Sequence, residues 1–264
     1  MADAALSRAP QPQGATGVLV LADGQVAWGK GFGAEGAAVG EVCFNTAMTG
    51  YEEIMTDPSY AGQVVTFTFP HIGNVGVNDE DLESAVEGAV GCVVREDVTA
   101  PSNFRSTGTF GDWLAAKGKI GLAGIDTRAL TRRIRLSGAP NAVIAHSADG
   151  KFDLPALLQR AQEWPGLEGM DLAQRVSRTA QEGWEGGAWT LGKGYARSPR
   201  GPVGDARPHV VAIDYGAKDN IFRNLVQAGA RVTVVPAKTS LEDILALDAL
   251  SRDAALEIVR RVGV

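Results

Sequence analysis

The 264-residue sequence contains few of the residue types that metal sites and disulfide-rich folds require. It has two cysteines, Cys43 and Cys92, and three histidines. Each cysteine lies in an apolar, strand-like segment, which favours a buried thiol over a disulfide or a metal ligand. The sequence therefore predicts no metal-binding residues.

Long apolar runs are also absent from the sequence, as are extended basic blocks. The formal net charge is -6 and no basic block of the kind that neutralises phosphates occurs, which argues against nucleic acid as a partner. No run of about 18 apolar residues is present, and the first residues lack the apolar core of a secretory signal. We expect no membrane partner and a cytoplasmic location.

Glycine is abundant, with 33 residues that indicate many turns, and the first half of the chain has strand patterns. The segment 17–31 predicts two strands joined at Asp23-Gly24, because Asp-Gly supplies the positive φ values of a two-residue hairpin turn. Residues 63–69 alternate apolar and polar, and residues 88–94 are nearly all apolar, so both are predicted strands. A β-rich first domain follows.

Three helices are predicted in the same half, over 110–117, from Asp126-Thr127 to Gly138, and over 154–163. The second of these has a basic face, because residues three and four apart are neighbours on a helix. Its members are Arg128, Arg132 and Arg135. This face is either a solvated surface or a contact for an anion or a partner, and both readings stay open.

The last part of the chain has the pattern of an α/β protein. Residues 190–208 are rich in glycine, proline and charge, which is typical of a linker. Beyond them, strands over 209–214 and 231–236 flank a helix over 217–227, which is a βαβ unit. Ser240 and Asp243 have the spacing of a capping box that opens a further helix.

Four segments resemble, in the same order, signature segments of one enzyme family, the glutamine-using small chain of carbamoyl-phosphate synthase. The resemblance covers about residues 15 to 247. The four segments are Cys43–Tyr60, Pro70–Gly76, Pro101–Arg105 and Gly124–Arg132.

The resemblance implies the fold class and the domains. The expected fold is α/β, with a β-rich N-terminal domain over 1–189, a linker over 190–208, and an incomplete class I glutamine amidotransferase-like α/β domain over 209–264. The resemblance ends near residue 248, so the chain is expected to be truncated in the amidotransferase domain. In the last sixteen residues, Ser251 is predicted to cap a short helix. A fragment, an internal deletion and a frame error are the alternatives for this end.

The resemblance also implies the function. The family hydrolyses glutamine and passes ammonia to a large chain, which makes carbamoyl phosphate for arginine and pyrimidine biosynthesis. The large chain and glutamine are therefore the expected partners. No cofactor is expected in this chain, and ATP and metal ions are expected on the large chain. The alternative is a catalytically incompetent fragment that only binds the large chain or acts as a scaffold.

Glutamine hydrolysis needs a thiolate nucleophile, a histidine base and an orienting carboxylate. In the family these residues lie in the second domain, beyond the part that this sequence resembles. Neither Cys43 nor Cys92 lies in a strand-to-helix turn of small residues, and no spacing pairs one of them with His71, His146 or His209. The sequence therefore predicts no catalytic residue, and the chain alone is expected to be inactive.

Ala47 is the one position to which the resemblance assigns substrate contact, because the family has there a serine that approaches the bound glutamine. Alanine lacks the hydroxyl, so only a main-chain contact remains. A small residue in a tight loop is the alternative interpretation. Nearby, Thr49 is a predicted N-cap, and Glu52 and Glu53 point to different helix faces, so they make a poor acid/base pair.

A nucleotide-binding α/β protein is a weaker alternative. The turn after Asp214 reads Tyr-Gly-Ala-Lys-Asp-Asn and matches neither glycine-rich phosphate-binding motif. We assign no cofactor-binding residues.

An incomplete parallel sheet leaves strand edges uncovered, so the region after about Pro208 is expected to be marginally stable.

Overall fold

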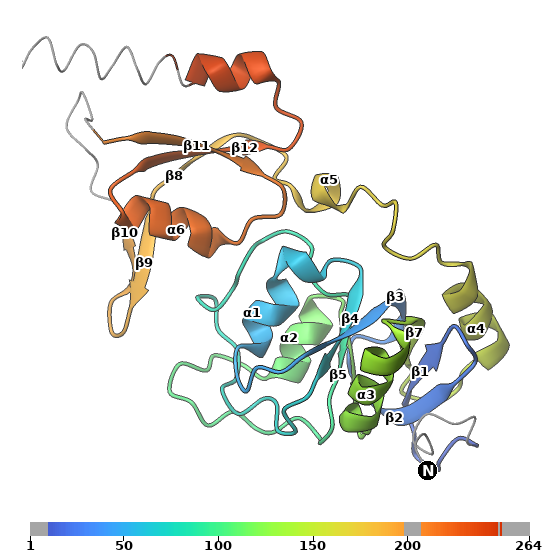
Figure 1. The fold of residues 1–264 in the computed structure, drawn as a ribbon. Coiled ribbons are helices and arrows are strands. Elements are labelled where there is room, and N and C mark those ends of the chain that lie inside the picture. The colour runs from blue at the N-terminus through green and yellow to red at the C-terminus, as the bar shows by residue number, and fades with distance from the viewer. Residues whose placement is uncertain (1–9, 198–206, 248, 250–264) are drawn as a thin grey trace, which may run out of the picture. The chain divides into compact units, whose positions relative to one another are not determined.

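The computed structural model describes residues 10–197, 207–247 and 249, which form two compact units (Figure 1). The first unit comprises the described residues up to 82 together with 87–170. The second comprises 83–86 and the described residues from 171 onward. The units divide at residue 171, about twenty residues before the linker expected over 190–208.

The first unit is built on a closed barrel of seven strands, which agrees with the predicted β-rich first domain. Three neighbouring pairs are parallel, namely β3 with β4, β4 with β5, and β5 with β6. The other four neighbouring pairs are antiparallel. Closure leaves the barrel without an edge strand. The order around the barrel is β1 (Gly17–Leu21), β2 (Val26–Gly33), β6 (Ile120–Ala123), β5 (Gly91–Val93), β4 (Gln63–Phe67), β3 (Gly36–Asn45) and β7 (Asn141–His146).

The two faces of the barrel strands bury different residues. In β1, Leu19 and Leu21 pack into one apolar cluster, while Val18 and Val20 pack into another. This division follows from the two-residue period of a strand, which sends successive side chains to opposite faces. Both faces of this strand are therefore covered, which explains its continuous apolar sequence.

Four α-helices and one short 3₁₀ helix cover the barrel. They are α1 (Tyr51–Thr56), η2 (Pro58–Tyr60), α2 (Phe110–Ala116), α3 (Thr127–Ser137) and α4 (Leu154–Glu163). The three predicted helices in this half are confirmed to within one residue at either end. Asp126 caps α3, because its carboxylate accepts hydrogen bonds from the N–H groups of Arg128 and Ala129.

Two local predictions were wrong. The N-cap of α1 is Gly50, with φ 82° and no side-chain cap, so Thr49 does not cap this helix. Four residues, 22–25, separate β1 from β2, and the Leu21 N–H donates to the Gln25 carbonyl, so the connection is longer than the predicted two-residue turn. Gly24 still supplies the positive φ, 86°, that such a loop needs.

Glycine permits the close packing of the barrel wall. A Cβ added at Gly121 in β6 would lie 2.3 Å from the Phe32 ring. Phe32 belongs to the neighbouring strand β2, and its aromatic ring fills the place that a side chain on β6 would need. The ring then packs beside Phe110 of α2 at 6.3 Å between centroids, so this glycine connects barrel and helix packing.

The second unit contains the predicted βαβ arrangement. Strands β11 (His209–Asp214) and β12 (Arg231–Pro236) pair in parallel and are connected by α6 (Asp219–Gln227). A third strand, β8 (Glu182–Trp184), pairs antiparallel with β12. This pairing explains why the residues just after 171 belong to the second unit. The unit also contains α5 (Leu172–Val176), β9 (Gly186–Thr190) and β10 (Gly194–Arg197).

Two features of the second unit bear on predictions near the end of the chain. The hairpin of β9 and β10 occupies the beginning of the expected linker. Residues 241–247 are helical, and the Asp243 N–H donates to Ser240 Oγ at 3.1 Å, which confirms the predicted cap. The helix predicted to begin at Ser251 lies outside the described residues.

Arg178 is central to the packing of the second unit. Its guanidinium lies 5.2 Å from the ring centroids of both Trp184 and Phe222 and forms an ion pair with Glu182 at 2.9 Å. It also contacts Asp219 of α6 at 2.5 Å. Cation–π contact and ion pairing together connect β8 with α6.

Among the described residues, no helix combines the length and the apolar character that a membrane span requires.

Candidate functional site

Three of the four signature-like segments come together in the first unit. We call their irregular parts the motif loops, comprising residues 45–50, 70–76 and 101–105. The Tyr51 hydroxyl donates to the Gly76 carbonyl at 2.7 Å, and the Ser102 N–H donates to the Asn74 carbonyl at 2.9 Å. The motif loops therefore form one connected surface although they are far apart in the sequence.

Ala47 lies at an exposed position in the first motif loop. Its N–H donates to Asn45 Oδ1 at 2.8 Å, and the amide nitrogen of Asn45 donates to the Tyr60 hydroxyl at 2.9 Å. The N–H of Ala47 thus already has a partner within its own loop. Its role in glutamine binding stays a prediction.

The second motif loop has a clear structural role. Gly73 adopts φ 113°, and a Cβ there would lie 2.5 Å from the Thr99 carbonyl oxygen. The Thr99 N–H in turn donates to the Ile72 carbonyl at 2.9 Å. Glycine is required at this close approach of two backbone segments.

A small cavity of about 130 Å³ lies beside the motif loops and α1. Glu52, which is only 3% exposed, accepts a hydrogen bond on Oε2 from the Asn78 N–H at 3.0 Å. Arg105 forms an ion pair with Asp81 at 2.6 Å and a second with Glu80 at 3.3 Å. The third motif loop is thereby fixed to the segment after the second.

Glu52 has an unusual environment for a carboxylate. Burial raises its pKa to about 8, the Asn78 N–H opposes this shift, and the nearby carboxylates of Asp81, Glu53 and Asp79 add to it. Its Oε1 is buried and has no hydrogen-bond partner among the described residues. The expectation that Glu52 and Glu53 make no acid/base pair fits their different exposure, because Glu53 is only partly buried.

The two cysteines lie in environments that disfavour the thiolate form. Cys92 is fully buried and Cys43 partly buried, and burial raises the pKa of both thiols, that of Cys43 to about 12. His146 Nδ1 contacts the Ala34 carbonyl and His209 Nε2 contacts Thr233 Oγ1. A thiolate nucleophile needs a lowered pKa, so the raised pKa values of these thiols are unfavourable for that role.

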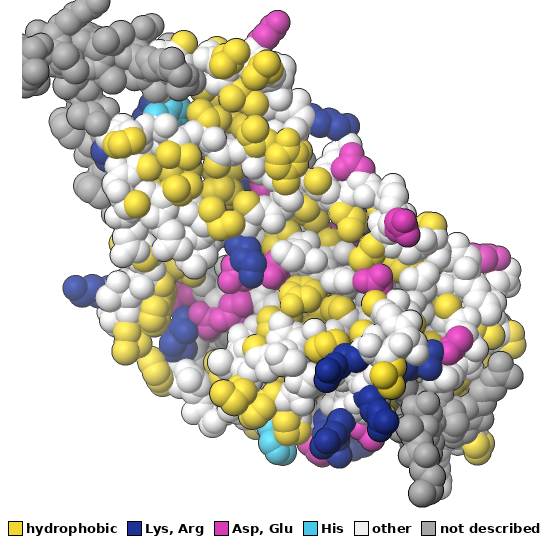
Figure 2. Space-filling view, viewed as in Figure 1, with side chains coloured by type: hydrophobic (Ala, Val, Ile, Leu, Met, Phe, Trp, Pro, Cys, Tyr) yellow, Lys and Arg dark blue, Asp and Glu magenta, His cyan; other side chains and the backbone are white. Residues whose placement is uncertain are grey.

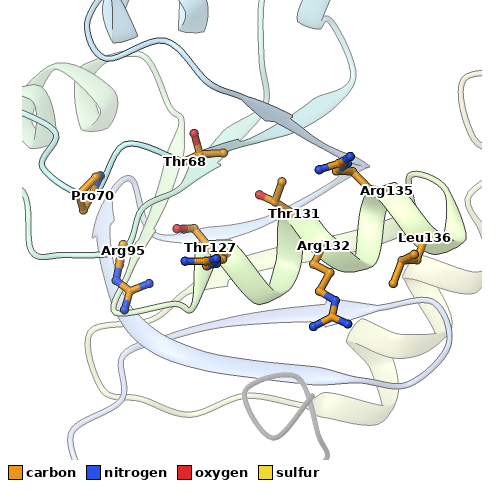
Figure 3. Close-up of a pocket in the computed structure, with 9 residues that line it drawn as sticks. Thr68, Pro70, Arg95, Thr127, Thr131, Arg132, Arg135 and Leu136 are labelled. Atoms are coloured by element: carbon orange, nitrogen blue, oxygen red, sulfur yellow. The ribbon is translucent and has the colours of Figure 1, made fainter. Parts of the chain in front are cut away.

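The fourth signature-like segment forms the start of α3 and lines a cavity of about 780 Å³ (Figure 3). The predicted basic face of this helix is therefore part of a concave surface. Figure 3 shows Thr127, Thr131, Arg132 and Arg135 following one another along α3, with Arg95 beyond the N-terminal end of the helix. The lining is completed by Thr68, Pro70, Arg128 and Leu136.

Two residues of these cavities, Arg95 and Glu52, have no local signal in the sequence. Arg95 comes from the loop after β5, about thirty residues before α3, so no local spacing connects it with the basic face of the helix. Glu52 carries no pattern that distinguishes a buried glutamate from an exposed one. Both placements depend on strand pairing across the barrel, which is a long-range property.

In the turn after Asp214, two main-chain donors already have a partner. The carboxylate of Asp214 accepts hydrogen bonds from the N–H groups of Gly216 and Ala217 at 2.9 and 2.8 Å. These are the kind of main-chain donors that a phosphate-binding loop presents to its ligand. No group of three or more metal-ligating side chains occurs in the part of the chain that the structure describes.

The closed mixed barrel and its motif loops define a mixed α/β protein with a β-rich first unit. Residues 19–144 match the family model described as the carbamoyl-phosphate synthase small chain, CPSase domain. The resemblance of the four segments to the carbamoyl-phosphate synthase small chain family is confirmed.

Curated relatives carry the same name, carbamoyl phosphate synthase small chain. The protein of Zymomonas mobilis is 61% identical over 230 residues, which are 86% of this chain and 60% of that protein. The protein of Bradyrhizobium diazoefficiens is 58% identical over 88% of this chain and 58% of its own length. The protein of Caulobacter vibrioides is 56% identical over 88% of this chain and 60% of its own length. The chain thus spans about 60% of the length of these relatives.

Proposed function

We propose that the chain acts as the small subunit of a glutamine-hydrolysing carbamoyl-phosphate synthase. The observation that carries the proposal is the identity of 61% over 86% of the chain with a protein named as this small chain. The subunit would supply ammonia from glutamine to a large chain, for carbamoyl phosphate used in arginine and pyrimidine biosynthesis. The proposed location is the cytoplasm, and ATP and metal ions would bind the large chain.

Domain organisation is part of the proposal. The N-terminal domain of the small chain would extend to about residue 189, followed by a linker over 190–208 and a partial class I amidotransferase-like domain over 209–264. The parallel β11–α6–β12 unit supports the last assignment, because βαβ units build the sheets of such α/β domains.

Ala47 is the proposed contact for glutamine in this chain. Its exposed position in a motif loop leaves it accessible to a ligand. The variant Ala47→Ser restores a hydroxyl donor and acceptor at this point. If Ala47 contacts glutamine, calorimetric titration will give tighter glutamine binding for Ala47→Ser than for the unmodified chain. Equal heats and affinities would contradict the site.

A second candidate function is binding to the large chain without catalysis. The observation that favours it is the state of the two thiols, one buried and one partly buried, whose pKa values are both raised. In that case the chain would act as a scaffold or binding subunit.

Ammonia release separates the two candidates. The 264-residue chain, with its mass verified, is incubated with glutamine alone and together with the large chain. Release that requires the large chain supports the catalytic subunit. Binding of the large chain without release supports the scaffold. Neither binding nor release would contradict both.

A further inference from the structure

The basic face of α3 carries charge that the described part of the protein does not neutralise. Arg128, Arg132 and Arg135 form no ion pair with any described residue. Arg95 has only long contacts, 3.6 Å to Glu96 and 3.7 Å to Asp126. In a chain of net charge -6, such a concentration of positive charge indicates a negatively charged partner.

The arginine side chains of α3 are arranged in a row along the helix. The three helix arginines are spaced by four and three residues, so they lie on one side of α3 and span about 10 Å along its axis. Figure 2 shows dark blue side chains gathered over the region where Figure 1 shows α3. A row of this length fits several separate carboxylates better than one compact anion.

Apolar and hydroxyl groups accompany the arginines. Leu136 is 75% exposed at one end of the row, and Pro70 lines the opposite end of the cavity. Thr131 Oγ1 is buried beside the cavity and has no hydrogen-bond partner among the described residues. Arginine mixed with exposed apolar side chains is typical of the centre of a protein interface.

We propose that the α3 face, defined as Arg95, Arg128, Arg132, Arg135 and Leu136, is a docking surface for a carboxylate-rich segment of the large chain. The partner's carboxylates pair with the guanidinium row, and an apolar side chain of the same segment covers Leu136. The inference rests on the proposed subunit role. It adds to that role the surface that makes the contact and the chemistry of its complement.

Charge reversal on α3 tests the docking surface. The variant Arg128→Glu/Arg132→Glu should retain the fold, because both side chains are exposed and position 128 lies in the first turn of α3, where an acidic residue is favourable. Binding of the large chain, measured by surface plasmon resonance at several salt concentrations, should weaken by roughly tenfold or more. Its salt dependence should also become smaller than that of the unmodified chain.

Lys117→Glu/Arg160→Glu is the matched control. It makes the same change in net charge at two exposed positions away from α3. Its dissociation constant for the large chain should stay within about twofold of that of the unmodified chain, since remote exposed charges contribute little to a contact. A second variant, Leu136→Ser, should weaken binding without altering its salt dependence. Thermal melts of all variants verify folding.

The outcomes separate this inference from the subunit role. If the unmodified chain does not bind the large chain, the proposed function fails. If it binds and the α3 variant binds equally well, the docking surface is overturned while the subunit role stands. Saturable binding of pyrophosphate to the chain alone, lost in the α3 variant only, would assign the face to a small anion and also overturn the proposal.

Discussion

Burial of Glu52 makes the stability of the fold depend on pH. Its carboxyl lies on the buried side of α1, with one oxygen accepting a hydrogen bond from the Asn78 N–H and the other without a partner among the described residues. Burial raises its pKa to about 8, from an ordinary value of about 4.3 in an unfolded chain. A raised carboxyl pKa means that the folded state holds a proton that the unfolded state releases. Glu52 therefore reduces stability progressively as the pH rises from about 4.3 to about 8.

The variant Glu52→Gln is expected to be more stable than the unmodified chain at alkaline pH. Glutamine keeps an acceptor for the Asn78 N–H and carries no charge. The free energy of unfolding of Glu52→Gln relative to the unmodified chain should increase by roughly 1–3 kcal/mol between pH 6 and pH 9 and level off above about pH 8. Thermal melts across this range measure it. The exposed Glu168→Gln serves as control, and a gain that is the same at every pH would contradict the burial argument.

At the scale of elements, α3 depends on its cap. The Asp126 carboxylate accepts hydrogen bonds from two N–H groups at the first turn, at 3.1 and 3.0 Å. Asp126→Ala should lower the free energy of unfolding by about 1 kcal/mol, because these donors lose their partner. Asp126→Asn should retain most of the stability, since asparagine caps equally well. Urea unfolding measures both, and equal losses would indicate that charge rather than capping matters.

The barrel wall gives a second prediction for an element. Gly121→Ala in β6 would place a Cβ 2.3 Å from the Phe32 ring, and this ring is held against α2. We expect a loss of about 1–3 kcal/mol in unfolding free energy from the resulting overpacking.

Gly111→Ala on α2 is the control for the barrel wall. Its nearest neighbouring atom would be Cδ2 of Phe32 at 4.0 Å, an ordinary contact. Because alanine favours helix over glycine, this variant should be unchanged or up to about 1 kcal/mol more stable. Unfolding by urea compares the two. A loss at Gly111 as large as that at Gly121 would argue against a steric cause.

At the scale of the whole molecule, the two units should differ in resistance to protease. The first has a closed barrel without edge strands, and helices pack on it. The second has an open three-stranded sheet with exposed Leu241, Leu245 and Tyr215. Limited proteolysis followed by mass spectrometry should leave a fragment that ends between about 170 and 208, because open edges and few buried contacts permit local unfolding. Equal resistance along the chain would contradict this expectation.

Local elements could be predicted from the sequence because their signals are local. Asp126 before an apolar-periodic run and Gly138 after it define α3, and both positions serve in the structure as expected. The βαβ pattern over 209–236 was recognisable for the same reason. The cap of α1 was missed because Gly50, in the left-handed conformation, takes the place that Thr49 was predicted to fill.

The sequence by itself determined the family resemblance, the β-rich first part and the helices α2, α3, α4 and α6, since motif order and short-range periodicity are properties of neighbouring residues. Tertiary structure alone decided which distant residues meet. Parallel pairing of β5 with β6 brings the Arg95 loop to the start of α3 and so completes the α3 face. Packing of α1 on the motif loops buries Glu52, and pairing of β8 with β12 sets the division between units at residue 171. Such contacts arise from chain segments that are far apart in sequence, where no local pattern records the pairing.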